Sequence, residues 1–272
     1  TLFRSHYGEI MHPKIKEIRL LSSIDNLINL RNEGTLDNNT YLNLKKLLDN
    51  RINNYDDYYG DNCNINIDDE TKKTAIVAFS GGVDSTASTI IANKIFNIIG
   101  ITAYSNEIMH QDNKKNISNL AKKLKIRHEF LDIDLNEVLK DTINGKYHPC
   151  GRCHTTVESA VLNYALENNI KYIIYGDMLS VGRLSIIKNK NNIVRINIPS
   201  FLSLTKNESR EILKKNNIVI SQKYGCSLLK KSHIFNHNKK FTIQRILREV
   251  RAQVIDKEEG VKNIMEVIDD LY

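Results

Sequence analysis

The feature that most constrains this chain is the immediate succession of a strand, a glycine turn and a helix within residues 75–89. Residues 75–79 (Ala-Ile-Val-Ala-Phe) are a short apolar run, typical of a strand buried on both faces. Gly81 and Gly82 end that run, and apolar residues return at helical spacing between Thr86 and Phe96. Exposed backbone N–H groups and the positive end of the helix dipole converge in such a turn. The segment therefore predicts an anion-binding site.

The turn reads Ser-Gly-Gly-Val-Asp-Ser, which is neither a Walker A loop nor a Gly-x-Gly-x-x-Gly pattern. Glycines let a phosphate approach the main chain, the serine hydroxyls can donate to it, and the carboxylate can hold Mg2+. The turn resembles the pyrophosphate loop (PP-loop) of the ATP pyrophosphatase superfamily, whose members bind ATP and adenylate a substrate oxygen with release of pyrophosphate. The resemblance implies ATP and Mg2+ as ligands of Ser80, Gly81, Gly82, Val83, Asp84 and Ser85.

Length and composition bound the class of protein. The 272 residues suffice for one domain with an appendage, and 41% hydrophobic with 26% charged residues is an ordinary globular composition. No apolar run reaches the roughly 18 residues of a membrane helix and no signal peptide leads the sequence, so a cytoplasmic protein without a membrane partner is expected. The net charge of +7 favours a polyanionic partner only weakly, since a basic surface also serves solubility.

Two helices are expected before the turn. Apolar residues recur at helical spacing over residues 15–30 and 40–52, and the polar residues 53–70 are expected to form a linker. The chain is thereby divided into a helical N-terminal extension, residues 1–70, and a PP-loop domain with C-terminal helices, residues 71–272. The extension could pair two subunits into a homodimer, grip another partner or pack on the core, and the sequence leaves these alternatives open.

Strands and helices alternate through the rest of the chain. Strands are expected at residues 75–79, 97–104, 127–134, 171–175 and 193–198, and helices at 113–125, 135–143, 155–168, 206–215 and 241–271. This alternation predicts an α/β fold with an open, mostly parallel sheet and helices on both faces. The PP-loop resemblance implies the adenine nucleotide alpha hydrolase-like version of that fold.

Ligands of such sheets bind beyond the carboxyl ends of the strands. The segments that follow Phe79, Tyr104 and Tyr175 should therefore share one crevice. Within it, Tyr104 and Gly176 are expected beside the nucleotide. The carboxylates of Asp84 and Asp177 are the candidate catalytic groups.

A second chemical signal is the pair Cys150 and Cys153, followed much later by Cys226. Two thiols three positions apart at a turn can bind one metal ion or cluster, and the third thiol ligand would come from a distant loop. A structural zinc needs a fourth ligand, which would be one of Cys63, His148, His154, His233 and His237. A cubane iron–sulfur cluster held by three cysteines leaves one iron open to an exogenous ligand. Unrelated thiols or a redox pair remain a further alternative.

A PP-loop followed by C-x-x-C and a lone cysteine resembles the iron–sulfur-dependent tRNA thiolases, the two-thiocytidine and two-thiouridine synthetases of the superfamily. The resemblance implies a 4Fe–4S cluster on Cys150, Cys153 and Cys226, a tRNA partner, and an ATP-dependent sulfurtransferase that forms AMP and pyrophosphate. Those enzymes typically carry Gly-His-x-x-Asp-Asp after the fourth strand, whereas this chain has Gly-Asp-Met-Leu-Ser-Val at residues 176–181. The cysteine pairs of their zinc fingers are also missing.

Three functions therefore compete. The first is thiolation of a tRNA base, with residues 230–251 as the best basic segment for RNA. The second is a superfamily enzyme that acts on a small molecule, by sulfur insertion in cofactor synthesis or by amide formation, which the missing acid pair favours. The third is a non-catalytic nucleotide-binding zinc protein. The acceptor and the sulfur donor are left open.

Overall fold

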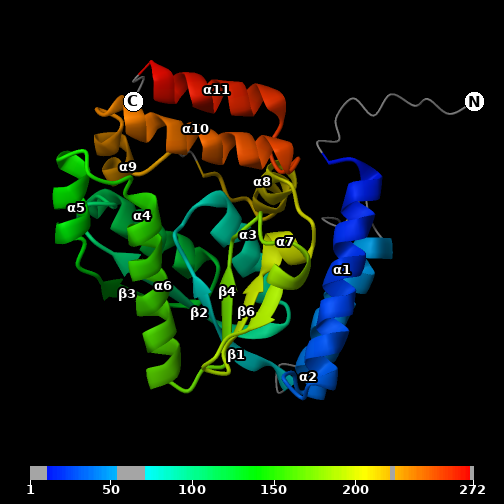
Figure 1. The fold of residues 1–272 in the computed structure, drawn as a ribbon. Coiled ribbons are helices and arrows are strands. Elements are labelled where there is room, and N and C mark those ends of the chain that lie inside the picture. Colours follow the sequence, from blue (N-terminus) through cyan, green and yellow to red (C-terminus); the bar gives the residue numbers. More distant parts are fainter. Residues whose placement is uncertain (1–10, 54–70, 221–223, 270–272) are drawn as a thin grey trace, which may run out of the picture.

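The computed structural model describes residues 11–53, 71–220 and 224–269. A six-stranded sheet of order β3-β2-β1-β4-β6-β5 forms its centre (Figure 1). All pairings are parallel except that of β5 with β6. The strands are β1 Lys73–Ala78, β2 Phe96–Tyr104, β3 Arg127–Asp132, β4 Tyr172–Tyr175, β5 Ile186–Lys188 and β6 Val194–Asn197. The predicted open, mostly parallel α/β sheet is confirmed.

Helices cover both faces of the sheet, as predicted. They are α1 Pro13–Asn32, α2 Asn38–Asn53, α3 Val83–Ala92, α4 Gln111–Lys123, α5 Asn136–Ile143, α6 Cys150–Glu167, α7 Ile198–Phe201, α8 Lys206–Lys215, α9 Ser227–Ser232, α10 Asn236–Arg251 and α11 Lys257–Ile268, with a 3-10 turn, η2, at Gly182–Leu184. None of these helices is apolar over a length that would cross a bilayer.

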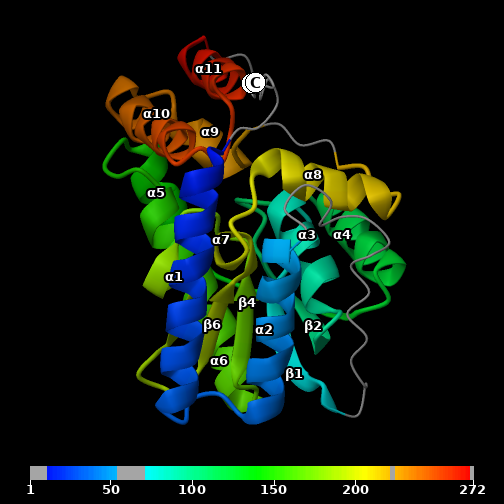
Figure 2. The same cartoon turned by 90° about the vertical axis from the view of Figure 1, so that its right-hand side faces the viewer.

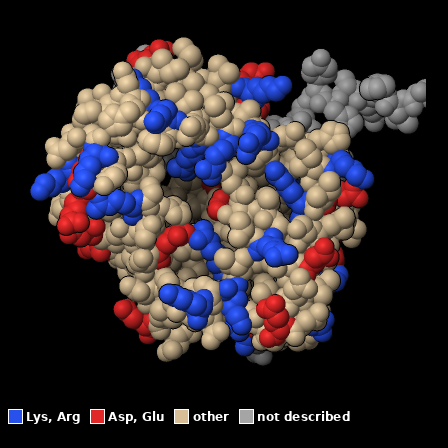
Figure 3. Space-filling model, in the orientation of Figure 1, with Lys and Arg blue, Asp and Glu red and all other residues tan. Residues whose placement is uncertain are grey.

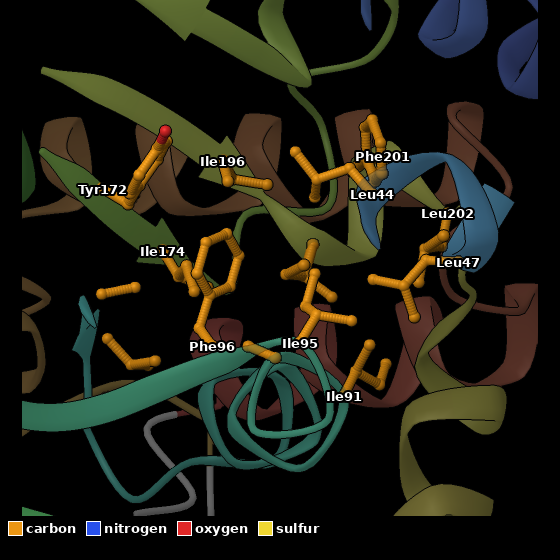
Figure 4. Packing of buried hydrophobic residues seen from close by; sticks show 14 of the residues in the cluster. Leu44, Leu47, Ile91, Ile95, Phe96, Tyr172, Ile174, Ile196, Phe201 and Leu202 are labelled. Carbon is orange, nitrogen blue, oxygen red and sulfur yellow. The ribbon is translucent and has the colours of Figure 1, made fainter. Parts of the chain in front are cut away.

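Alternate residues of β1 face two separate hydrophobic clusters. Ala75 and Val77 face the larger cluster, to which α1, α2, α3, α4 and α8 contribute, whereas Ile76 faces α6 through Val161 and Ala165. Figure 4 shows the larger cluster, where leucines of α2 meet side chains of α3, β4 and the segment after β6. Ala75, Ile76 and Val77 are fully buried on both faces of β1, which explains the continuous apolar sequence there.

The N-terminal helices pack on the core, which is one of the three expected alternatives. Figure 2 shows α1 and α2 side by side in front of the sheet. Arg51 of α2 is fully buried, and its guanidinium lies 2.6 Å from the carboxylate of Glu208 and donates to the Leu202 carbonyl at 3.0 Å. Lys16 of α1 contacts the same carboxylate at 3.0 Å. The proposed boundary at residue 70 and Cys63 lie outside the described residues.

Several element boundaries differ from those expected. Helix α6 begins at Cys150 rather than near Thr155, because the Cys153 N–H donates to the Pro149 carbonyl at 3.0 Å and closes the first turn there. The predicted single helix over 241–271 is two helices, since Asp256 accepts from the Glu259 N–H and starts α11 anew. The short elements β5, α7 and α9 have too few residues to show a period. Thr205 is the N-cap of α8 and forms a capping box with Glu208.

Candidate active site at the carboxyl edge of the sheet

The predicted PP-loop connects β1 to α3. Gly81 has φ +70°, and a Cβ there would lie 2.6 Å from the Ile117 side chain, so a glycine is needed. The Ser80 and Ser85 hydroxyls are 3.0 Å apart, and the Ser85 hydroxyl donates to the Gly82 carbonyl at 3.1 Å. Gly82 caps α3 without a side-chain hydrogen bond to the helix N–H groups. Both hydroxyls and the first N–H groups of α3 thus meet at the end of β1, as an anion site requires.

Gly176, directly after β4, packs on the backbone of this loop. A Cβ at Gly176 would lie 2.8 Å from the Ser85 nitrogen and 2.9 Å from the Asp84 carbonyl carbon. Because β4 pairs with β1, and β1 with β2, the carboxyl ends of the three strands are neighbours as expected. The structure gives Gly176 a packing role at the loop, and its contact with a nucleotide stays a prediction.

Asp84, at the second position of α3, is the carboxylate that faces the site. Its Oδ2 lies 2.6 Å from Lys206 Nζ, at the start of α8. Its Oδ1 is buried and accepts no hydrogen bond from any residue the structure describes. A buried, unused carboxylate oxygen normally has a ligand. Asp84 therefore fits the predicted Mg2+ role, with Lys206 as a cation that sequence analysis missed.

The side chains of Tyr104 and Asp177 both form hydrogen bonds with other residues of the protein. The Tyr104 hydroxyl accepts from Gln111 at 2.7 Å, and Lys114 Nζ lies 3.9 Å from the centre of its ring. The carboxylate of Asp177 accepts from the Leu179 N–H at 2.8 Å and from the Ser180 hydroxyl, which closes its own turn. The nucleotide contact of Tyr104 and the catalytic role of Asp177 stay predictions.

The three predicted cysteines gather at the same edge of the sheet. Cys150 and Cys153 occupy the first turn of α6, and Cys226 is the N-cap of α9. The Ser227 hydroxyl holds α9 to the Glu107 carbonyl, just beyond β2, at 2.6 Å. Leu228 of α9 belongs to the same apolar cluster as Cys153. Cys226 therefore lies on the side of the sheet where Cys150 and Cys153 are.

The thiols are close enough to influence one another's protonation. Burial, together with the charges of Cys226 and Cys150, raises the pKa of Cys153 to about 11. Burial also raises the pKa of Cys150, Arg245 opposes this, and Cys226 adds to it. No three His, Cys, Asp or Glu side chains in the described part of the chain are gathered tightly enough to hold one metal ion.

One stripe of α10 connects the cysteines to the PP-loop. Arg245 lies 3.6 Å from the carboxylate of Glu249, one turn further along, and its charge lowers the pKa of the Cys150 thiol. Burial raises the pKa of Glu249, Arg245 and Lys206 oppose that rise, and the charge of Asp84 adds to it. Charged side chains of α10 are therefore near both Cys150 and Asp84. Arg245 and Glu249 were not predicted from the sequence, although their four-residue spacing would place them on one helix face.

The surface over this edge is hollowed and basic. Figure 3 shows a depression below α10, with lysine and arginine side chains along its upper rim. Residues 226–251 contain seven lysines and arginines and one carboxylate, Glu249. Such a rim attracts a polyanionic substrate.

A glycine-rich loop at the carboxyl end of the first strand of a parallel sheet, followed by a helix that carries a half-buried aspartate, is the arrangement of the PP-loop fold. The family model of the Queuosine biosynthesis protein QueC matches residues 74–148, which span this loop.

The chain belongs to the family of a Methanocaldococcus jannaschii protein with the name "Uncharacterized protein MJ1638", to which it is 47% identical over 268 residues, 98% of each chain. Among solved structures it is similar to the U34-tRNA thiolase NcsA from Methanococcus maripaludis with its 4Fe–4S cluster (16% identity, TM-score 0.43, 79% of this chain and 78% of that one). It is also similar to NMN synthetase from Francisella tularensis (14% identity, TM-score 0.44, 87% and 95%). At these identities and TM-scores neither likeness bears on the activity of this chain.

Proposed function

We propose that this protein is an ATP-dependent sulfurtransferase that thiolates a base of tRNA. The observation that carries the proposal is the placement of the Cys150, Cys153 and Cys226 thiols at the edge of the sheet where the PP-loop lies. A nucleotide-activating loop beside clustered thiols is the combination that activation of an oxygen and its replacement by sulfur would require.

In the first step, a carbonyl oxygen of the base attacks the α-phosphorus of ATP, and magnesium pyrophosphate leaves. The hydroxyls of Ser80 and Ser85 and the N–H groups of α3 would hold the leaving phosphates. Asp84 would bind Mg2+ through its unused Oδ1, and Lys206 would offset negative charge beside it. These groups position the reactants in line and stabilise charge on the leaving group.

In the second step, sulfide attacks the activated carbon of the base, the bond from carbon to the phosphate-linked oxygen breaks, and AMP departs. Base, ATP and sulfide thus become thiolated base, AMP and pyrophosphate, with no net oxidation. The residues that would face this step are the three thiols and Arg245, whose guanidinium can hold an anion near Cys150.

From this donor set we infer a 4Fe–4S cluster on Cys150, Cys153 and Cys226. The charges of the three thiols influence one another. Cys150 and Cys153 would bind the cluster from the first turn of α6 and Cys226 from the N-cap of α9. Bound there, the cluster would supply an open iron for an exogenous sulfur ligand.

A tRNA substrate is supported by the basic rim of the depression and by the excess of cations in residues 226–251. The decisive experiment begins with anaerobic purification, followed by iron and sulfide analysis and a visible spectrum. Nucleoside analysis of tRNA incubated with the protein, ATP, Mg2+ and sulfide is then compared with tRNA incubated without ATP.

Iron near four equivalents and a new thiolated nucleoside, formed only with ATP, are the expected results. Colourless protein that contains zinc and consumes no ATP would refute the proposal in favour of a nucleotide-binding zinc protein. ATP consumption without RNA thiolation would refute the tRNA substrate and leave a small-molecule acceptor. Whether the protein forms a homodimer is a separate question, which light scattering would answer by measuring its mass in solution.

A further inference from the structure

The N-terminal helix α1 carries apolar residues on two opposite sides. Its inward side is buried in the core through three leucines, Leu20, Leu27 and Leu30. On the outward side, Ile18, Leu21 and Ile28 are 58%, 51% and 37% exposed. Figure 1 places α1 at the edge of the molecule, and Figure 2 shows it in front of the sheet. The helix therefore presents a row of exposed apolar side chains at the outside of the fold.

The exposed row has the spacing of a helix-pairing seam. With two charged residues it recurs at alternating separations of four and three positions, as Lys14, Ile18, Leu21, Asp25 and Ile28, which we call the outer stripe. At 3.6 residues per turn these positions fall within about 80° around the helix axis. A narrow seam of this period is what one helix presents to another in coiled-coil packing. The outer stripe therefore suits a second helix.

The two charges of the outer stripe select an antiparallel second copy. In a parallel pair of α1 helices, Lys14 would face Lys14 of the partner subunit, and Asp25 would likewise face its own counterpart. In an antiparallel pair about a twofold axis, Ile18 meets Leu21 of the partner subunit and Lys14 meets Asp25 of the partner subunit. Sliding that pair by one heptad would place Asp25 against a leucine and desolvate its carboxylate. The stripe is thus complementary to itself in one orientation and register.

Both charged side chains can take part in such a contact. Asp25 is exposed, and it makes no ion pair with another described residue. Lys14 Nζ lies 3.7 Å from the carboxylate of Glu17 in the same turn, and both side chains are more than half exposed. An exposed pair of this kind contributes at most about 1 kcal/mol. Lys14 can therefore turn to a partner's carboxylate without losing a strong interaction.

Helix α1 is held firmly enough to serve as a platform. The Arg19 guanidinium donates to the Ala252 carbonyl, in the α10–α11 turn, at 2.9 Å, and the Asn26 amide donates to the Arg183 carbonyl of η2 at 3.2 Å. Leu184, next to that second contact, is 57% exposed and widens the apolar surface beside α1. A surface that is ordered before binding loses little conformational freedom on association.

From this geometry we infer that the outer stripe is the contact surface of a homodimer in which the α1 helices of two copies pair antiparallel. The inference does not depend on the proposed function. A helix of 20 residues is about 30 Å long, so one helix pair buries less area than the roughly 1,200 Å2 of a standard stable interface. The dimer should accordingly exchange with monomer at micromolar concentrations.

Sedimentation equilibrium of the full chain, over about 1 to 500 µM, measures the dissociation constant of the dimer. Leu21→Asn changes two symmetry-related contacts at the centre of the pair and should raise the Kd by ~10-fold or more. The matched control is Leu42→Asn, at an exposed leucine of the neighbouring helix α2, and its Kd should equal that of the unchanged protein.

Charge reversal tests the orientation of the two helices. Lys14→Glu or Asp25→Lys alone places like charges together at two symmetry-related positions, so each should raise the Kd by ~10-fold or more at low salt. The double variant Lys14→Glu/Asp25→Lys restores opposite charges and should return the Kd to within about threefold of the unchanged value. Circular dichroism and Tm of every variant report whether the fold is intact.

The possible results are distinct. A protein that stays monomeric over the whole concentration range would overturn the inference, as would a dimer whose Kd does not respond to Leu21→Asn. A double charge reversal that fails to recover the Kd would overturn the antiparallel pairing. A monomer whose Tm falls in Leu21→Asn would mean that the same chain covers the stripe, which also overturns the dimer. The sulfurtransferase proposal stands or falls separately, because its assays measure iron and thiolated nucleosides.

Discussion

Lys206 Nζ lies 2.6 Å from Oδ2 of Asp84, although the two residues are far apart in the chain. Helix α8 brings the lysine to the PP-loop. The charge of Asp84 there contributes to the raised pKa values of Arg210 and Glu249. The pair leaves Oδ1 of Asp84 buried and unused. A lysine in this position offsets the charge of the carboxylate and faces the place where phosphates would lie.

Replacing Lys206 by methionine should lower ATP–pyrophosphate exchange by about 100-fold or more, because one preorganised charge at the reacting phosphates would be lost. Lys206→Arg should retain more activity than the methionine variant. The matched control is Lys214→Met, at an exposed lysine of the same helix. Equal exchange rates for the Lys206 and Lys214 variants would remove the lysine from the site.

Gly176→Ala tests the contact between β4 and the PP-loop. The added methyl would lie under 3.0 Å from backbone atoms of Asp84 and Ser85, so the loop must shift. ATP affinity, measured by calorimetry, should fall by ~10-fold or more, with a lower Tm. Gly151→Ala is the control, since a Cβ there meets nothing within 4 Å, and its ATP affinity and Tm should not fall. Normal ATP binding by Gly176→Ala would contradict the packing described.

The cysteines can be tested one at a time. Cys150→Ala, Cys153→Ala and Cys226→Ala should each reduce bound iron to near background in anaerobic preparations, because three ligands are the fewest that hold a cubane cluster with one open iron. ATP binding should stay within about twofold, since these three cysteines lie on α6 and at the start of α9 rather than on the loop. Any variant with unchanged iron content takes its cysteine out of the ligand set.

In metal-free protein the alkylation of Cys153 should depend on pH well into the alkaline range. Burial raises the pKa of this thiol to about 11, so the reactive thiolate is scarce at neutral pH and increases up to that value. Iodoacetamide labelling read by peptide mass spectrometry should therefore accelerate continuously from pH 7 to 10. A rate that levels off near pH 9 would show that the thiol is not shielded in this way.

The buried pair of Arg51 and Glu208 should dominate the attachment of α2 to the sheet. Arg51→Met leaves the Glu208 carboxylate without its closest cation, which we expect to lower the free energy of unfolding by about 3–5 kcal/mol. Urea unfolding followed by circular dichroism measures this. Adding Glu208→Gln should recover part of the loss, and a double variant no better than Arg51→Met would argue against the pair.

The same carboxylate makes stability depend on acid pH. Although burial alone would raise the pKa of Glu208, Arg51 and Lys16 lower it to about 2. Because the folded value is below the unfolded one of about 4.3, the contribution is complete above pH 4.3 and is lost as pH falls toward 2. The difference in stability between unchanged protein and Glu208→Gln should shrink over that window. A difference independent of pH would refute the assignment.

Much of the fold follows from local pattern. The apolar run before Gly81 predicted a buried strand, and residues 75–77 of β1 are fully buried on both faces. Strands β2, β3, β4 and β6 and helices α4, α5 and α8 fall within a few residues of their expected ranges, because each is long enough to show a period. Helix α6 was expected too late, since Gly151 disfavours a helix in isolation while Pro149 and the docked α10 stabilise its first turn here.

By itself the sequence determined the identity of the loop, because Ser80–Ser85 form a contiguous turn whose backbone needs are met by glycines within it. The sequence also identified the three cysteines as candidate ligands of a metal or cluster. Only the tertiary structure decided that Lys206 contacts Asp84, and that Arg245 and Glu249 of α10 come near Cys150 and Asp84. The reason is physical: these contacts join residues distant in the chain, and side chains so far apart meet only after helices have packed on the sheet.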